Sequence, residues 1–211
     1  MSWPETHRPH DMVQPIRRPK GSMINVIIDT RESERALVPT LSSLVPGVTA
    51  GLLGEVVIAD AGSTDATAEV ADIAGCRFVA SSEPLGVRLR AAAASTRAPW
   101  LMFLQAGTAL EPGWVGIVDR FMEKADLMQG ARAAVFRAQA TDVMPGFGAV
   151  LAALRASFAG APKPEQGLLI ARALYDELGG HPPHAEADIA LLRRLGRRRI
   201  ALLAAGARVP R

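Results

Sequence analysis

Cysteine and aromatic residues are rare in this chain. Among its 211 residues there is one cysteine, Cys76, and aromatic side chains make up 5%. A single thiol cannot form an internal disulfide, and it excludes zinc ribbons and redox motifs built from cysteine pairs. Cysteine usage gives no sign of an oxidising compartment, so we expect a cytoplasmic protein.

Lysine is also rare, and arginine carries almost all of the positive charge. Three of the 24 cationic residues are lysines, and 21 acidic residues leave a formal net charge of +3. A nucleic-acid-binding protein usually concentrates a strong basic surface to displace counterions from phosphate. The small net charge therefore predicts no general binding to nucleic acid, whereas arginine still suits small phosphorylated ligands.

We expect neither a membrane span nor a secretion signal in this sequence. Its longest uncharged stretch, 36–54, is interrupted by Pro39, Pro46 and three glycines, which argues against a transmembrane helix. Residues 1–22 carry four prolines and several basic side chains but no apolar segment of the kind a signal peptide needs. We interpret 1–22 as a disordered leader or a cloning remnant and 23–211 as a single domain. Peripheral membrane contact and oligomeric state stay open.

Apolar patterns of two periods alternate from residue 23 to residue 137. Short β-branched runs are typical of strands buried on both faces, and apolar residues every three or four positions are typical of helices. The expected strands are 24–28, 55–59, 77–80, 100–104 and 131–137. The expected helices are 34–44, 64–73, 85–96 and 113–124. This alternation predicts an α/β fold with right-handed crossovers and a mostly parallel sheet that helices cover on both faces.

The rhythm changes after residue 141. A helix rich in small residues is expected over 146–158, and a proline-rich turn follows it. Two further helices, 172–178 and 185–195, and a short strand over 200–203 complete the chain. We expect this part to form a helical lobe beside the sheet.

Polar residues gather where three of the expected strands end. They lie at 29–32, 60–65 and 105–108. Ligands of open parallel sheets bind at the carboxyl ends of the strands, so these segments are the candidate site. The most informative residue is Asp60, because a carboxylate at a strand end has no capping role and is expected to face the cleft.

The residues after Asp60 have a structural interpretation of their own. Gly62 permits a tight turn, and Ser63 can cap the following helix by accepting hydrogen bonds from its first N–H groups. Asp65 is favoured near the positive end of the helix dipole. None of these three features requires a ligand.

The segment from Glu55 to Thr67, with its Asp-Ala-Gly-Ser-Thr-Asp turn, resembles the nucleotide-binding signature of family 2 glycosyltransferases of the GT-A fold. The strand end at 28–32 is similar to the Pro-Thr-x-Asn-Glu motif of that family, and 86–94 resembles its glycine-and-basic segment. Residues 100–104 look like the strand that delivers the metal-binding acidic motif. The resemblance implies a GT-A-like, Rossmann-type sheet with a helical lobe on the acceptor side.

The distal half is most similar to bacterial family 2 enzymes associated with arsenosugar biosynthesis. Residues 164–167 resemble their Gly-Asp-Gln-Gly turn, and 168–180 resemble the strand and the helix ending in Gly-Gly that follow it. Residues 187–199 are similar to their Glu-Asp pair and the helix ending Arg-Arg-Leu-Gly-Arg-Arg. The resemblance covers about residues 23 to 205.

The resemblance implies transfer of a glycosyl group from a nucleoside-diphosphate sugar to an acceptor hydroxyl, with inversion. The roles that it implies are a nucleotide pocket lined by Thr30, Glu32 and Asp60, phosphate neutralisation by Arg88, a donor or acceptor contact from Gln166, and proton acceptance by Asp188.

Several positions depart from the family pattern. Gly107 stands where the family has an aspartate that helps to hold a divalent cation, usually Mn²⁺ or Mg²⁺. Glycine offers no side-chain oxygen to a cation, so no residue is assigned as a metal ligand and the acidic motif is interpreted as degenerate. Arginine can neutralise a diphosphate in place of a metal, and Arg88 and Arg90 are the candidates for this role. Pro-Thr-x-Asn-Glu also lacks its Asn here, and Asp29 replaces its Pro.

The expected general base has alternatives. The family's Glu-Asp pair is reduced to Ala187-Asp188, and a slipped register would place Glu186 in the role of the base. Asp188 also lies in the first turn of a helix, where a carboxylate stabilises the dipole without any catalytic role. His181 and His184 flank two prolines, and two histidines without a third donor are more typical of loop residues than of metal ligands.

These departures leave three functions open. The first is a transferase that needs no metal, and the second is a catalytically degenerate protein that binds a nucleotide sugar or an active partner. The third, a sugar nucleotidyltransferase, is disfavoured because a glycine-rich phosphate loop with Arg or Lys is missing after the first strand.

Overall fold

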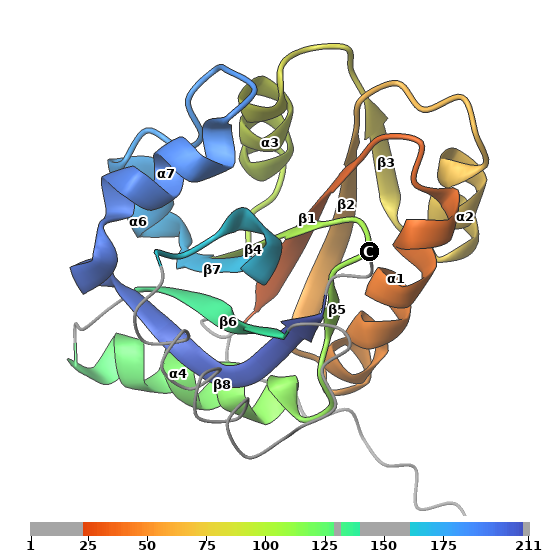
Figure 1. Cartoon of the computed structure of the whole chain (residues 1–211). Helices are drawn as coiled ribbons and strands as arrows, with labels where there is room; N and C mark the ends of the chain where they lie inside the picture. Colours follow the sequence, from red (N-terminus) through yellow and green to blue (C-terminus); the bar gives the residue numbers. More distant parts are fainter. Residues whose placement is uncertain (1–22, 129–131, 140–160, 209–211) are drawn as a thin grey trace, which may run out of the picture.

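The computed structural model describes residues 23–128, 132–139 and 161–208. Within these residues, eight strands form one sheet in the order β3-β2-β1-β4-β7-β6-β8-β5 (Figure 1). The strands are β1 (Ile24–Thr30), β2 (Leu53–Asp60), β3 (Arg77–Ala80), β4 (Trp100–Gln105), β5 (Ala109–Leu110), β6 (Ala133–Gln139), β7 (Leu168–Ala171) and β8 (Ile200–Arg208). The helices are α1 (Glu34–Thr49), α2 (Thr67–Ile73), α3 (Leu85–Ala94), α4 (Trp114–Met128), α6 (Arg172–Glu177) and α7 (Ala187–Leu195), with 3-10 turns η2 (Pro164–Gln166) and η3 (Arg197–Arg199).

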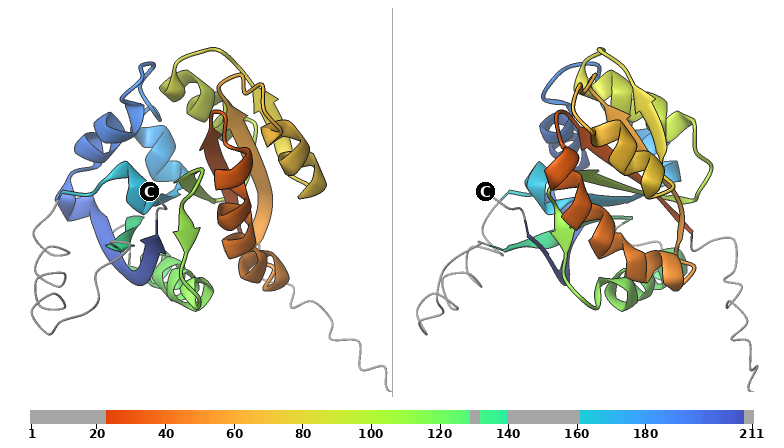
Figure 2. Two further views of the ribbon diagram at one scale, coloured as in Figure 1. Left: turned by 45° about the vertical axis from the view of Figure 1, so that its right-hand side comes forward. Right: turned by 90° about the vertical axis from the view of Figure 1, so that its right-hand side faces the viewer.

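The first half of the sheet is parallel, as the sequence pattern predicts. β1 pairs with β2 and β4, and β2 pairs with β3, all in parallel. The residues of β1 are buried except for Asp29, which is partly exposed at the carboxyl end. Such a strand needs cover on both faces, and α1 and α2 lie on one side of it while α3, α6 and α7 lie on the other (Figure 2).

The second half of the sheet is mixed. β7 runs antiparallel to both β4 and β6, β8 runs parallel to β6, and β5 runs antiparallel to β8. The α/β class is confirmed. The parallel pairing in the first half of the sheet comes from the strand-helix-strand crossovers of residues 24–105. The curled shape that results brings β4 and β7 beside the helices of the carboxyl-terminal lobe (Figure 2).

Several elements differ from the expected bounds. α1 continues through Pro39 and Pro46 to Thr49, and the two-residue β5 had no signal in the sequence. α2 begins at Thr67 and not at residue 64, because the preceding residues form a hydrogen-bonded turn with the ends of β1 and β2. The helix expected over 146–158 lies outside the described residues.

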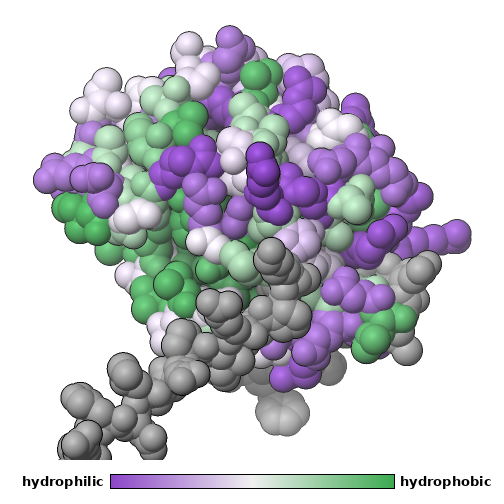
Figure 3. All heavy atoms as spheres, turned by 180° about the vertical axis from the view of Figure 1, so that it is seen from behind, coloured by the Kyte–Doolittle hydropathy of each residue, from purple (hydrophilic) through white to green (hydrophobic). Residues whose placement is uncertain are grey.

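The outer surface of α1 is apolar. Val45 and Val48 are exposed there, and with Ile73 of α2 they line a groove between the two helices. In the view from behind, green apolar surface is visible on the left side, where these helices lie (Figure 3). The inner face of α1 is apolar too, which accounts for the uncharged stretch at 36–54. Across the part of the chain that is described, no helix has the length and apolar character needed to cross a bilayer.

Candidate active site

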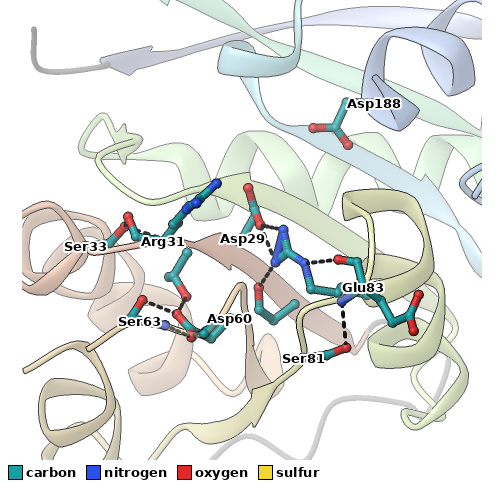
Figure 4. A network of polar contacts seen from close by, with 12 residues as sticks. Asp29, Arg31, Ser33, Asp60, Ser63, Ser81, Glu83 and Asp188 are labelled. Carbon is teal, nitrogen blue, oxygen red and sulfur yellow. Dashed lines mark hydrogen bonds and ion pairs between the residues drawn. The ribbon is translucent and has the colours of Figure 1, made fainter. Parts of the chain in front are cut away.

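The candidate site lies at the carboxyl ends of β1, β2 and β4, where α7 faces the sheet (Figure 4). Parallel pairing aligns Thr30 with Asp60, and Asp29 with Gln105. A pocket opens beside these strand ends, and its polar lining residues are Asp29, Gln105, Lys163, His181 and Asp188. The polar segments that the sequence analysis singled out are therefore neighbours in space.

Asp60 organises the turn after β2. Its Oδ2 accepts hydrogen bonds from the backbone N–H groups of Gly62 at 2.7 Å and Ser63 at 2.6 Å. Its Oδ1 accepts from the hydroxyls of Thr30 at 2.7 Å and Ser63 at 2.6 Å. Burial acts to raise the pKa of Asp60, but the hydrogen bonds from Ser63, Thr30 and Gly62 outweigh it and lower the pKa below its usual value. Asp60 is thus a buried carboxylate at neutral pH.

The loops after β1 and β2 are joined by reciprocal hydrogen bonds. The N–H of Glu32 donates to Oγ of Ser63 at 2.8 Å, and the N–H of Thr64 donates to Oε1 of Glu32 at 2.8 Å. Glu32 has a φ of +47°, a left-handed conformation that is unfavourable for a residue with a side chain. The hydrogen bonds between the two loops hold Glu32 in this conformation, so the backbone strain at Glu32 lies within the candidate site.

Asp188 lies in the first turn of α7, on the opposite wall of the pocket from β1. Its side chain is 17% exposed, and its Oδ1 lies 3.1 Å from Nε2 of His181. Asp29 projects from β1 into the same pocket. Two carboxylates therefore face one cavity, with an imidazole beside one of them.

The sequence from residue 25 to residue 194 matches the family model described as glycosyl transferase family 2. The chain belongs to glycosyltransferase family 2. No curated protein sequence matches it significantly.

Solved structures place this family 2 chain in the GT-A fold. One similar structure is glucosyl-3-phosphoglycerate synthase from Mycobacterium tuberculosis in complex with Mn²⁺, UDP and phosphoglyceric acid. It has a TM-score of 0.62 and 24% identity, over 86% of this chain and 68% of that chain. Mannosyl-3-phosphoglycerate synthase from Rubrobacter xylanophilus has a TM-score of 0.62 and 16% identity, over 86% of this chain and 65% of that chain. At these identities the similarity concerns the fold.

The family resemblance implies a divalent cation held in part by an aspartate at position 107, where this chain has glycine. Among the residues that the structure describes, His, Cys, Asp and Glu side chains form no cluster of three or more that could hold an ion. Gly107 has a φ of +96°, and its N–H donates to Oγ1 of Thr40 at 2.9 Å. An aspartate at position 107 would be strained in this backbone conformation, so glycine suits the turn as it is built.

The predicted phosphate contact of Arg88 is not supported by the geometry of this family 2 chain. Arg88 is 9% exposed, and Nη1 and Nη2 donate to Oδ1 of Asp29 at 3.0 and 2.9 Å. Nη1 also donates to the carbonyl of Ala59, and Nε donates to the carbonyl of Glu83. These internal acceptors occupy the guanidinium, which ties α3 to the ends of β1 and β2.

Three other predicted binding residues also have internal partners. The hydroxyl of Thr30 is buried on Asp60, and Glu32 binds the N–H of Thr64. Gln166 uses both ends of its amide, since Nε2 donates to the carbonyl of Phe136 at 2.7 Å and Oε1 accepts from the N–H of Lys163 at 2.8 Å. These residues shape the loops around the pocket. Ser63 is not a helix cap, because its hydroxyl joins the loops after β1 and β2.

Two cationic residues that were not among the predicted binding residues face the site. Arg31 is exposed, and in Figure 4 its side chain extends to the same side of the loop as the carboxylate of Asp29. Its guanidinium has no hydrogen bond or ion pair with the described residues. Lys163 is exposed and lines the pocket. Arg31 belongs to the polar segment 29–32 that the sequence predicts at the site, whereas only the tertiary structure brings Lys163 to it.

Asp29 is expected to make the stability pH-dependent. Burial raises the pKa of Asp29 to about 6, against the lowering effect of Arg88 and with the help of the negative charges of Asp188 and Asp60. The folded state therefore keeps the proton up to about pH 6, whereas the unfolded chain releases it near the ordinary aspartate pKa of 3.8. Stability from this group is present at low pH and is lost as the pH rises from about 4 to 6.

The measurement is the free energy of unfolding of the wild type and of Asp29→Asn, from urea titrations at several pH values between 4 and 7. Asparagine does not ionise, so from pH 4 to 7 the free energy of unfolding of the wild type should fall by roughly 2 kcal/mol relative to that of the variant. A difference that is constant with pH would contradict the raised pKa of Asp29.

Proposed function

We propose that this protein transfers a glycosyl group from a nucleoside-diphosphate sugar to an acceptor hydroxyl, with Asp188 as the general base. The observation that carries the proposal is the place of Asp188: a partly exposed carboxylate on the wall of a pocket at the carboxyl ends of β1 and β4. This is where ligands bind in open α/β sheets, and it lies beside the organised loops after β1 and β2.

The chemical step follows from this placement. The proton of the acceptor hydroxyl passes to the carboxylate of Asp188 while the acceptor oxygen forms a bond to the anomeric carbon. The bond between that carbon and the nucleoside diphosphate breaks at the same time, which inverts the configuration. The nucleotide would rest on the loops that Asp60 and Glu32 hold together.

We further propose that arginine and lysine, in place of a metal ion, neutralise the diphosphate. The support is Gly107, which has no side-chain oxygen where the family has an aspartate, together with two exposed cations: Arg31, beside the strand ends in Figure 4, and Lys163, in the pocket lining. Arg88, one of the two candidates from the sequence, is bound to Asp29 and is not available without breaking that pair. A guanidinium can bind two phosphate oxygens at once, so Arg31 suits the role.

The test is calorimetric titration with UDP, GDP and their common sugar conjugates, each with and without manganese. We expect metal-independent binding of one of them in the micromolar range, about −8 kcal/mol. Arg31→Gln should weaken it about tenfold, and Arg35→Gln is the matched control, because the Arg35 side chain is 96% exposed in the first turn of α1 and its Nε lies 3.7 Å from Oε1 of Glu34. Binding that requires manganese would overturn the metal-free proposal, and no binding under either condition would overturn the transferase proposal.

One observation favours a second function, a catalytically degenerate protein that binds a nucleotide sugar or a partner enzyme. Asp188 is preceded by Ala187, which is fully buried, so the Glu-Asp pair implied by the resemblance is absent. Binding of a donor without donor hydrolysis or transfer to any acceptor would favour this function over the transferase.

A further inference from the structure

We infer that Tyr175 and His181 form a relay behind Asp188: Tyr175 is hydrogen-bonded to His181, and the imidazole of His181 contacts Asp188 and positions it for proton transfer. This inference rests on the proposed function, because it assigns a task to residues behind the proposed base. His181 lies in the loop between α6 and α7, as the sequence pattern predicts, but its side chain is buried there, with 1% exposed.

A tight turn brings the three residues together. The chain reverses after α6 through Gly179 and Gly180, with φ values of +74° and +69° that favour glycine. The N–H of Gly180 donates to the carbonyl of Tyr175 at 2.9 Å, and a Cβ at Gly180 would lie 3.0 Å from the Tyr175 ring. The turn thereby places the ring of His181 beside that of Tyr175, with ring centroids 5.5 Å apart.

The partners of the imidazole are defined on both sides. Its Nδ1 lies 2.9 Å from the hydroxyl of Tyr175, and its Nε2 lies 3.1 Å from Oδ1 of Asp188. The Nε2 contact is at ion-pair distance but is not aligned as a hydrogen bond, and the described residues offer this buried atom no other partner. The ring of Phe103 packs edge-on against His181, with ring centroids 4.6 Å apart.

The protonation pattern follows from counting donors. The Tyr175 hydroxyl accepts a hydrogen bond from the backbone N–H of His181 at 3.3 Å, and it has one proton to donate. If that proton goes to Nδ1, the imidazole proton sits on Nε2 and points toward the carboxylate of Asp188. The opposite pattern would direct a lone pair at the carboxylate and leave the buried Tyr175 proton without an acceptor.

This arrangement gives Asp188 a fixed direction. With Oδ1 in contact with His181 at 3.1 Å, the second oxygen of the carboxylate is left to accept the proton of the acceptor hydroxyl. His181 acts through Asp188 and is therefore a positioning residue. Such residues matter because catalytic groups need supporting contacts to hold a productive geometry.

The first experiment measures the tautomer of His181 by long-range ¹H–¹⁵N NMR on the labelled wild-type protein. We expect the pattern of an imidazole protonated at Nε2, and we expect Tyr175→Phe to change it. An imidazole protonated at Nδ1 in the wild type would overturn the relay. This readout needs no turnover, so it decides the relay even if the proposed function fails.

The second experiment compares kinetics and donor binding. His181→Phe should lower kcat about 10- to 100-fold while the Kd of the donor stays within about twofold. His181→Gln should recover most of kcat, because its amide can donate near the position of Nε2. His184→Gln is the matched control on the same loop, since that side chain is exposed and its backbone carbonyl holds Gly86.

The outcomes of the second experiment are distinguishable. Wild-type kcat in His181→Phe, or no recovery in His181→Gln when both variants are folded, would overturn the relay. A wild type that binds no donor overturns the proposed function instead, and the NMR result then stands alone as the test of the hydrogen bonds.

Discussion

Replacement of Asp188 by asparagine is expected to lower kcat about 10²- to 10⁴-fold, the usual contribution of a general base. Asparagine keeps the size of the side chain and an oxygen that can face Nε2 of His181, but it cannot accept the acceptor proton. The Kd of the nucleoside-diphosphate donor should therefore stay within about twofold. Steady-state kinetics and calorimetry of the same preparation give the two numbers.

Glu186→Gln is the matched control for Asp188→Asn. Glu186 is exposed at the start of α7, whereas Asp188 lines the pocket. We expect its kcat to be close to that of the wild type. If Glu186→Gln were the inactive variant and Asp188→Asn the active one, Glu186 would be the general base in place of Asp188. The relay behind Asp188 would then have no function.

Replacement of Gly86 by alanine is expected to lower the free energy of unfolding by about 3 kcal/mol, the upper part of the range for overpacking. A Cβ at this position would lie 1.7 Å from the carbonyl oxygen of Pro182 and 2.7 Å from Cβ of Ala187. The N–H of Gly86 also donates to the carbonyl of His184 at 3.2 Å. Backbone atoms cannot move aside as a flexible side chain can, so α3 and the loop before α7 must separate.

Because that loop carries His181 and leads to Asp188, Gly86→Ala should reduce activity as well as stability. Gly116→Ala in α4 is the control, since its Cβ would meet just one side-chain atom of Arg120, at 3.4 Å. A helical alanine without a clash should be neutral or stabilising by up to about 1 kcal/mol. Urea titrations of the two variants measure the contrast, and equal unfolding midpoints would contradict the close packing of α3 against this loop.

The sequence predicted the strand-helix order well because the first half of the chain follows local rules. β-Branched runs become buried strands and amphipathic segments become the helices between them, with errors at the ends of α1 and α2. The short strand β5 could not be predicted, because its two residues are held by pairing with β8, which lies about a hundred positions further along the chain.

The site was predicted less completely than the fold. The motif around Asp60 identified the correct edge of the sheet, yet Thr30, Asp60 and Gln166 use their polar atoms on neighbouring loops. A motif shows which residues belong together, but not whether they contact a ligand or support one another. Arg31 lies in the predicted segment 29–32, but nothing in the sequence distinguished it from its neighbours there, and a histidine beside prolines such as His181 resembles an ordinary loop residue.

The sequence by itself determined the α/β class, the family, and the strand ends at which the site lies, because these depend on local periodicity and on short contiguous motifs. The tertiary structure alone decided what each polar group does. It paired Arg88 with Asp29, closed the turn that places His181 between Tyr175 and Asp188, and brought Gly86 against Pro182. The physical reason is that hydrogen bonds, burial and close packing depend on distances between residues that are far apart in the chain.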